Sequence, residues 1–230
     1  MLLKSFILEQ AVNNIQPKLK SKLNSDCNWE ALTEPSLMRE LTLCLLSSNV
    51  KYEIASLYVE KIQKSNLFYN WLINLPKETE IFEILNSSVF FNEKAIRYRF
   101  PKLKSHQLYE TLISLYSNGN NLKTLLKNSQ NGYYARIALV NRCKGIGNKQ
   151  ASMFIRNIGF SNELAILDTH LIDYLKCLNI ISSDISINTN KKYQNVEKLY
   201  LTYAIEKQYN LRVLDFAIWS VMKVYKSEFN

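Results

Sequence analysis

Residues 133–175 read YYARIALVNRCKGIGNKQASMFIRNIGFSNELAILDTHLIDYL, and this stretch decides the fold of the chain. Apolar residues recur at helical spacing in 135–142 and again in 151–158. The intervening segment, Lys144-Gly145-Ile146-Gly147-Asn148, is too short to be anything but a tight turn that joins two helices. The stretch therefore predicts two helices connected by a hairpin.

The turn contains two glycines and is followed by a lysine, and these residues suggest binding and chemistry. Gly145 and Gly147 allow the backbone to take positive φ and to come close to another molecule. The helix after the turn begins with free backbone N–H groups, which suit a phosphate. Lys149 stands at that helix start, where the helix dipole and partial burial favour the neutral amine. A neutral amine can form a Schiff base with a sugar carbon, whereas a charged one would be one more contact to a phosphate.

An aspartate follows nineteen residues after this lysine. Asp168, in the segment Ile166-Leu167-Asp168-Thr169-His170, precedes an apolar helical run and is well placed as the N-cap of a helix. An N-cap role alone would explain this residue. Together, Lys149 and Asp168 are two possible halves of one active site.

Positive charge is concentrated in the middle of the chain. The 230 residues carry a net charge of +9, and the segment from Lys94 to Asn162 holds twelve Lys or Arg residues against one acid, Glu110. The remainder of the chain is slightly acidic. Such clustering predicts a surface that contacts a phosphate backbone, although a solvated basic face would give the same composition.

Composition also indicates the compartment and the fold class. No apolar run approaches the length of a membrane span, which predicts a soluble protein with no membrane partner. The four cysteines are scattered without a CxxC pair, as is typical of reduced thiols in a cytoplasmic protein: Cys27, Cys44, Cys143 and Cys177. Strand signals are weak throughout, so the chain is expected to be all-α.

Helices are expected along most of the chain. In the first helix, within 1–32, Phe6, Ile7, Val12 and Ile15 are the expected apolar positions. The segment Thr33-Glu34-Pro35-Ser36 has the features of a helix start, and Ser47-Ser48-Asn49 of a helix end. Further helices are expected near 52–65, 68–74, 79–86, 92–98, 102–116 and 121–128, and two more after Tyr174.

Five segments carry a resemblance to a known family. They are RELTLCLLSSN at 39–49, YRFPKLKSHQL at 98–108, KGIGNKQASMFIRNIGF at 144–160, ILDTHL at 166–171 and LDFAIW at 214–219. The chain resembles the helix–hairpin–helix DNA glycosylase superfamily, and within it the compact, archaeal-type 8-oxoguanine DNA glycosylase/lyase. This resemblance implies two helical domains, 33–160 with the helix–hairpin–helix and 1–32 together with 161–230, and an active site in the cleft between them.

The resemblance also implies the chemistry. Lys149 would attack C1′ of the damaged nucleotide, displace the base and form a Schiff base, after which β-elimination would cut the strand. Asp168 would stabilise positive charge that develops on the sugar. No cofactor is implied. The expected partner is double-stranded DNA that contains 8-oxoguanine, bound by a monomer in the cytoplasm, associated with the nucleoid in a prokaryote.

Further residues acquire roles from the same resemblance. The hairpin residues Gly145, Gly147 and Asn148 and the downstream His170 would bind DNA phosphates. Asn49 would fill the gap that the flipped base leaves, and Trp219 would stack on the oxidised guanine. No essential metal is implied, although the hairpin carbonyls of Asn141, Cys143 and Ile146 could hold a monovalent cation.

Two alternatives remain open from the sequence. The first is a glycosylase/lyase for another oxidised base, but the endonuclease III type carries four closely spaced C-terminal cysteines for an iron–sulfur cluster, and no cysteine follows Cys177. The second is a helix–hairpin–helix module that binds DNA without chemistry. Trapping with borohydride separates the second from the enzymes, because a pure binder gives no covalent adduct.

If the basic middle segment contacts phosphates, affinity for undamaged duplex falls steeply with salt, by a log–log slope of about −0.9 for each phosphate contacted. Arg142→Ala or Lys144→Ala should weaken binding to damaged and undamaged duplex alike, because phosphate contacts carry no sequence information. Fluorescence anisotropy titrations at several salt concentrations measure both effects. An affinity that hardly changes with salt would contradict the predicted phosphate-contacting surface.

Overall fold

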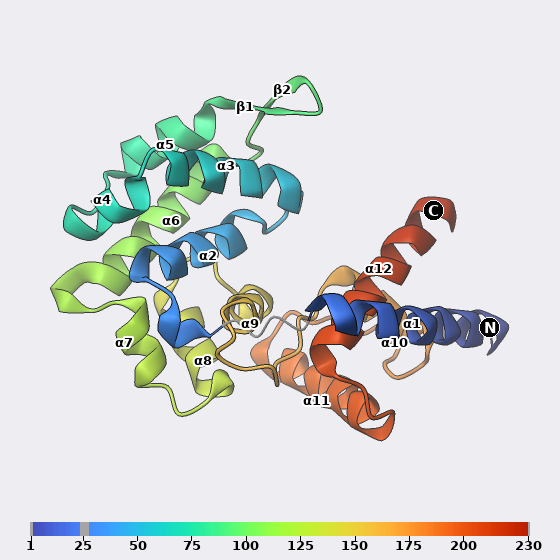
Figure 1. Ribbon diagram of the computed structural model, residues 1–230. Helices are drawn as coiled ribbons and strands as arrows, with labels where there is room; N and C mark the ends of the chain where they lie inside the picture. The colour runs from blue at the N-terminus through green and yellow to red at the C-terminus, as the bar shows by residue number, and fades with distance from the viewer. Residues whose placement is uncertain (1, 24–27, 230) are drawn as a thin grey trace. The chain divides into compact units, whose positions relative to one another are not determined.

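The computed structural model describes residues 2–23 and 28–229, which fold into helices and one small β-hairpin (Figure 1). Contacts divide the chain into two compact units. The first comprises Met1–Cys27 and Asn162–Asn230, and the second comprises Asn28–Ser161. The all-α class predicted from the sequence is confirmed. Within the described residues, no helix is long and apolar enough to cross a membrane.

The second unit contains most of the secondary structure. Its helices are α2 (Glu34–Leu46), α3 (Tyr52–Lys64), α4 (Leu67–Ile73), α5 (Glu78–Asn86), α6 (Pro101–Tyr116), α7 (Leu122–Lys127), α8 (Gly132–Arg142) and α9 (Asn148–Asn157). Short 3₁₀ turns occupy Trp29–Ala31 (η1) and Ser117–Gly119 (η2). The helices expected near 52–65, 68–74, 79–86, 102–116 and 121–128 are therefore present.

Helix α2 is the central element of this unit. It begins where the sequence indicated, with the Thr33 side chain accepting a hydrogen bond from the Ser36 amide at 3.3 Å. Leu37, Met38 and every residue from 41 to 46 are buried, because α3, α4, α6, α7 and α9 all pack against it. A helix that is apolar on nearly all sides is stable only inside such a cluster.

A β-hairpin replaces the helix expected near 92–98. Strands β1 (Ser88–Phe91) and β2 (Lys94–Arg97) pair antiparallel, with Phe91 opposite Lys94. Asn92 and Glu93 form the two-residue loop with φ of 48° and 63°, the left-handed pair that matches the twist of a hairpin. Glutamate is not among the usual residues of such a turn, so the sequence signal was weak.

The first unit brings both ends of the chain together. Helix α1 (Leu2–Leu23) packs against α10 (Thr169–Cys177) and α12 (Leu211–Phe229), and α11 (Asn190–Glu206) packs against α12. The expected inward face of α1 was partly wrong. Phe6 and Ile7 are more than half exposed, whereas Leu8 and Val12 are buried, because the apolar stripe runs through positions 8, 12, 15 and 19.

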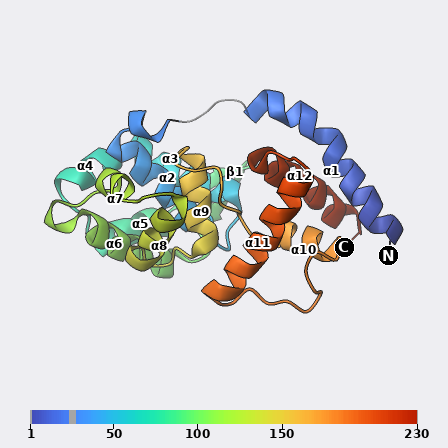
Figure 2. The same cartoon turned by 90° about the horizontal axis from the view of Figure 1, so that it is seen from below.

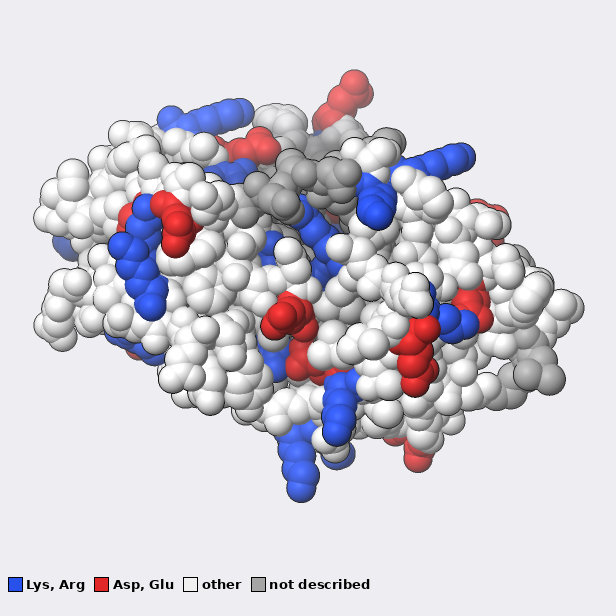
Figure 3. Space-filling view, turned by 60° about the horizontal axis from the view of Figure 1, so that its bottom comes forward, with Lys and Arg blue, Asp and Glu red and all other residues white. Residues whose placement is uncertain are grey.

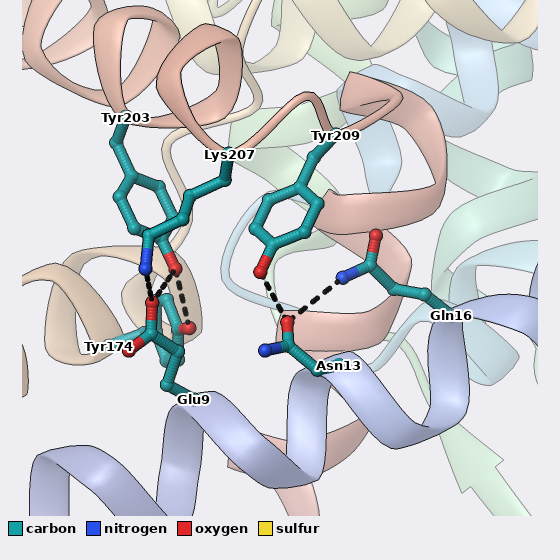
Figure 4. Close-up of polar contacts among 7 residues, drawn as sticks. All are labelled: Glu9, Asn13, Gln16, Tyr174, Tyr203, Lys207 and Tyr209. Atoms are coloured by element: carbon teal, nitrogen blue, oxygen red, sulfur yellow. Dashed lines mark hydrogen bonds and ion pairs between the residues drawn. The ribbon is translucent and has the colours of Figure 1, made fainter.

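Polar contacts tie α1 to the later part of this unit (Figure 4). The Lys207 ammonium lies 2.6 Å from the Glu9 carboxylate, which also accepts a hydrogen bond from the Tyr203 hydroxyl at 3.2 Å. The Tyr209 hydroxyl donates to the Asn13 side chain. These bonds fix α1 in register along the helices that follow Asn162.

The cysteines agree with the expectation of reduced thiols. Cys44, Cys143 and Cys177 are free, and burial raises the pKa of Cys143 to about 12. Cys27 lies outside the described residues.

Candidate active site

Helices α8 and α9 form the expected hairpin and lie side by side in both views (Figure 1 and Figure 2). Gly145 has φ of +79°, a backbone conformation that favours glycine. Gly147 does not, since its φ is −99° and ψ is −177°, so the expectation of positive φ holds only for Gly145. Gly147 instead serves as the N-cap of α9 without a capping side chain.

Helix α6 holds this hairpin from one side. The Gln107 side chain lies directly against Gly145, where an added Cβ would come within 2.3 Å of the Gln107 Cδ. The Thr111 hydroxyl donates to the Lys144 carbonyl at 3.2 Å, and Arg142 donates to the Ser114 carbonyl at 2.8 Å. The sequence analysis missed these α6 contacts, because nothing in the spacing of residues 101–116 indicates which turn they support.

The beginning of α9 offers unpaired donors. The backbone N–H groups of Lys149 and Gln150 make no hydrogen bond within the described ranges 2–23 and 28–229. Together with the positive end of the helix dipole, such amides form an anion site. The hairpin can therefore bind a phosphate through its backbone, irrespective of base sequence.

Lys149 is half-buried in the first turn of α9, on the side of α2. Burial and the Glu40 carboxylate raise the pKa of the Cys44 thiol, and the Lys149 ammonium opposes them, which places this lysine near α2. The two helices are also joined by a 2.7 Å hydrogen bond from Asn157 to Glu40. Lys149 thus projects from a rigid helix whose orientation is fixed by the core.

Fewer basic side chains of the segment 94–162 are exposed than the composition suggests. Three of the twelve cations in the middle segment, Lys104, Arg136 and Arg156, are almost fully buried. Arg136 donates to the Ser152 hydroxyl at 3.2 Å and so links α8 to α9. Arg142 is also bound within the protein, so Lys144, which is exposed, is the cleaner test of phosphate contact. The face in Figure 3 shows basic and acidic side chains interspersed.

Asn49 lies just after the C-terminus of α2. Its φ is 60°, a left-handed conformation that asparagine tolerates better than most residues, and its side chain is exposed. No hydrogen bond of this side chain is found within the described part of the chain. The residue is presented to solvent on a tight turn.

Asp168 occupies the N-cap of α10, as expected, and its carboxylate accepts a hydrogen bond from the Leu171 amide at 2.8 Å. One carboxylate oxygen is thereby used for the helix. The second oxygen can interact with a ligand without disturbing the cap.

His170 lies near Asp168 within the first unit and contacts Trp219. The rings of His170 and Trp219 meet edge to face, with centroids 6.3 Å apart. Burial lowers the pKa of His170. The carboxylates of Asp168 and Asp173 oppose this shift, whereas the ammonium groups of Lys226 and Lys223 add to it. The lowered pKa favours the neutral imidazole, which would contact a phosphate through an uncharged N–H donor.

Trp219 is a surface residue of α12. It is 36% exposed, which separates it from an ordinary core tryptophan. The Lys223 ammonium lies 4.6 Å from its ring centroid, a cation–π contact that sequence reasoning did not anticipate. Helical spacing of i and i+4 is the signal that would have found it.

The site residues are thus divided between the two units. Asn49, Gly145, Gly147, Asn148 and Lys149 belong to the second unit, whereas Asp168, His170 and Trp219 belong to the first.

Carbonyl oxygens at the hairpin were expected to suit a monovalent cation. The Cys143 carbonyl accepts a hydrogen bond from the Ile146 amide at 3.2 Å, so it could offer a cation its second lone pair. Within the described residues there is no group of three or more His, Cys, Asp or Glu side chains that could hold a metal.

Two packed helices, a glycine turn held in a left-handed conformation, and a lysine in the first turn of the second helix define a helix–hairpin–helix protein. A family model described as 8-oxoguanine DNA glycosylase matches residues 21–209. The chain belongs to this family.

Individual relatives agree with this assignment. An 8-oxoguanine DNA glycosylase/AP lyase of Saccharolobus islandicus is 32% identical over 182 residues, which cover 79% of each chain. The crystal structure of the 8-oxoguanine DNA glycosylase of Thermotoga maritima has a TM-score of 0.71 and 26% identity, covering 94% of this chain and 93% of the other. A Methanocaldococcus jannaschii 8-oxoguanine glycosylase/lyase, in complex with a 15mer DNA containing 8-oxoguanine, shares the fold, with a TM-score of 0.73, 23% identity, and coverage of 95% and 96%.

The different conformations of the two hairpin glycines predict different outcomes of substitution. Gly145→Ala should cost about 1–2 kcal/mol of folding stability, because alanine is strained at this φ and meets Gln107. Gly147→Ala should cost less, about 0.5 kcal/mol, because alanine is a poorer N-cap than glycine, although its backbone is unstrained there and its Cβ would meet only the Gln150 side chain at 3.5 Å. Urea unfolding measures both variants. Equal stability of the two would show that the α6 contact does not constrain the turn.

Proposed function

We propose that this protein is a bifunctional DNA glycosylase and AP lyase that excises 8-oxoguanine from duplex DNA and then cleaves the strand. Its family membership supports the substrate, as do the names of its relatives. The observation that carries the chemistry is the position of Lys149, a half-buried amine in the first turn of α9, beside backbone amides suited to a phosphate. A module that only binds phosphates would gain nothing from a partly buried amine, because exposed lysines serve that purpose.

The proposed reaction begins at the Lys149 amine. Its nitrogen forms a bond to C1′ as the bond from C1′ to the base nitrogen breaks, and the base leaves with the bonding electrons and takes up a proton. Loss of a proton from the nitrogen and opening of the sugar ring give the Schiff base. The Schiff base then acidifies C2′, and loss of that proton expels the 3′ phosphate by β-elimination.

Asp168 is proposed to act on the same nucleotide. As the base leaves, positive charge develops on the sugar, and a fixed carboxylate stabilises that charge more than it stabilises the neutral ground state. The bond from the Leu171 amide holds the carboxylate in place before substrate arrives. This arrangement needs no cofactor.

The remaining residues are proposed to bind and hold the DNA. Gly145, Gly147 and Asn148 would hold one phosphate, and His170 a second. Asn49 would occupy the space left by the flipped nucleotide, and Trp219 would stack on the oxidised base. A monovalent cation at the hairpin carbonyls would help to orient the amides. We propose that the protein works as a monomer in the cytoplasm, on nucleoid DNA in a prokaryote.

Lys149→Gln removes the nucleophile but keeps a polar side chain. Base excision and strand cleavage should both collapse, whereas binding to damaged duplex should largely survive because the hairpin amides are unchanged. Borohydride trapping on a duplex with 8-oxoguanine detects the Schiff base, and fluorescence anisotropy measures the affinity for the duplex. A trapped adduct with this variant would show that another amine is the nucleophile, and absence of an adduct with the wild type would indicate a pure binding protein.

Asp168→Asn tests the charge of the carboxylate separately from its capping role. Asparagine is a good N-cap, so the thermal midpoint should change little, while single-turnover excision falls by roughly two to three orders of magnitude. Asp168→Ala is the matched control, because it removes the cap as well and should cost about 1 kcal/mol of stability. Full activity of the asparagine variant would show that Asp168 serves only as the N-cap of α10.

A further inference from the structure

Lys104 is a buried cation in the first turns of α6, and the proposed reaction does not use it. It is 4% exposed, and its ammonium donates to the Leu45 carbonyl at 2.9 Å. Within the described ranges this is the one hydrogen bond that the ammonium makes. Burial lowers its pKa to about 8, which leaves the ammonium form dominant at pH 7.

This position is unfavourable for a lysine if stability alone is considered. Burying an ammonium costs free energy, and the first turns of α6 place the charge near the positive end of its own helix. A methionine would fill the same volume without these costs. The charge is offset at one place, the C-terminus of α2, where the helix dipole is negative and carbonyls lack helical partners.

The last carbonyls of α2 are all bonded. Those of Leu43 and Cys44 accept from the backbone and the hydroxyl of Ser47, which is local capping. The Leu45 carbonyl accepts a long local bond from the Ser48 amide at 3.4 Å and a shorter one from Lys104, which lies outside α2, at 2.9 Å. The Leu46 carbonyl accepts from the hydroxyl of the buried Tyr98. Two side chains from the 98–104 segment therefore fix the point at which the chain leaves α2.

The chain that leaves α2 is the turn that presents Asn49. The Val50 amide donates to the Ser47 carbonyl at 3.4 Å, which closes the turn, and Asn49 adopts its left-handed conformation within it. A displacement of the end of α2 would be transmitted directly to the Asn49 side chain, because only two residues separate Asn49 from the Leu46 carbonyl.

We propose that Lys104 is a positioning residue that anchors the end of α2, so that Asn49 is held where it can replace the flipped nucleotide. This inference rests on the proposed function, in which Asn49 enters the duplex. Lys104 acts through the backbone of Leu45 and does not contact DNA itself. Tyr98 acts on the next carbonyl in the same way.

The test compares Lys104→Met with Tyr98→Phe, the second anchor, and with Ser105→Ala. Ser105 is a matched control, because it is buried on the same helix and, among the described residues, its hydroxyl donates only to the Lys102 carbonyl of its own turn. The DNA probe is a duplex with 2-aminopurine opposite 8-oxoguanine, whose fluorescence rises when the opposite base loses its partner. Excision is measured on this duplex and on one in which 8-oxoguanine faces an abasic-site analogue, where flipping costs less.

Lys104→Met should reduce both the fluorescence rise and the excision rate from the paired duplex by about tenfold, the effect of one hydrogen bond to a charged group. Tyr98→Phe should reduce both in the same direction, and the double variant should lose less than the sum of the two. Excision opposite the abasic analogue should change by less than about twofold, and the thermal midpoint of Lys104→Met at pH 7 should not fall. Ser105→Ala should match the wild type throughout.

Equal losses on the two duplexes, together with a lower thermal midpoint, would overturn the proposal and make Lys104 a core residue. Unchanged fluorescence and excision in Lys104→Met and in Tyr98→Phe would also overturn it. If Lys104→Met does not fold, Tyr98→Phe alone decides in the same way. A wild-type protein that raises the fluorescence but does not excise the base would contradict the proposed chemistry and leave the positioning role standing.

Discussion

The close contact between Gln107 and Gly145 is the constraint on which the hairpin depends. Any residue other than glycine would be strained at position 145, where φ is +79°. Gln107 also occupies the space that a side chain at this position would need. The bond from Thr111 to the Lys144 carbonyl fixes the same turn. The hairpin therefore has its shape before DNA arrives, so little binding free energy is spent in ordering it.

Helix α6 acts as a common reference for the two separate loops that are proposed to contact DNA. Lys104 bonds to the end of α2 and Thr111 bonds to the hairpin, about 10 Å apart along a helix that rises 1.5 Å per residue. Because a helix is stiff over that length, the turn that carries Asn49 and the turn that precedes Lys149 keep their spacing. Loops presented by separate flexible elements would not.

The helices and the hairpin could be predicted because their signals are local, such as apolar spacing, caps and glycines. The left-handed Gly145 and the N-cap Asp168 follow from residue type and position alone. The Asn92–Glu93 turn was missed since glutamate rarely occupies it, and Phe6 and Ile7 were misassigned because three apolar residues in a row define no face. The role of α6 depends on contacts 28 to 59 residues apart in sequence, which no periodicity records.

The assembly of the first unit from both ends of the chain bears on biosynthesis. During translation, the unit that carries Lys149 can fold as soon as residue 161 has emerged, while α1 must wait for its partners among residues 162–230. Until then Leu8 and Val12 have no core to enter. A nascent or prematurely terminated chain thus holds Lys149, the proposed nucleophile, without the carboxylate of Asp168, and the proposed base excision cannot appear before synthesis has passed the start of α10.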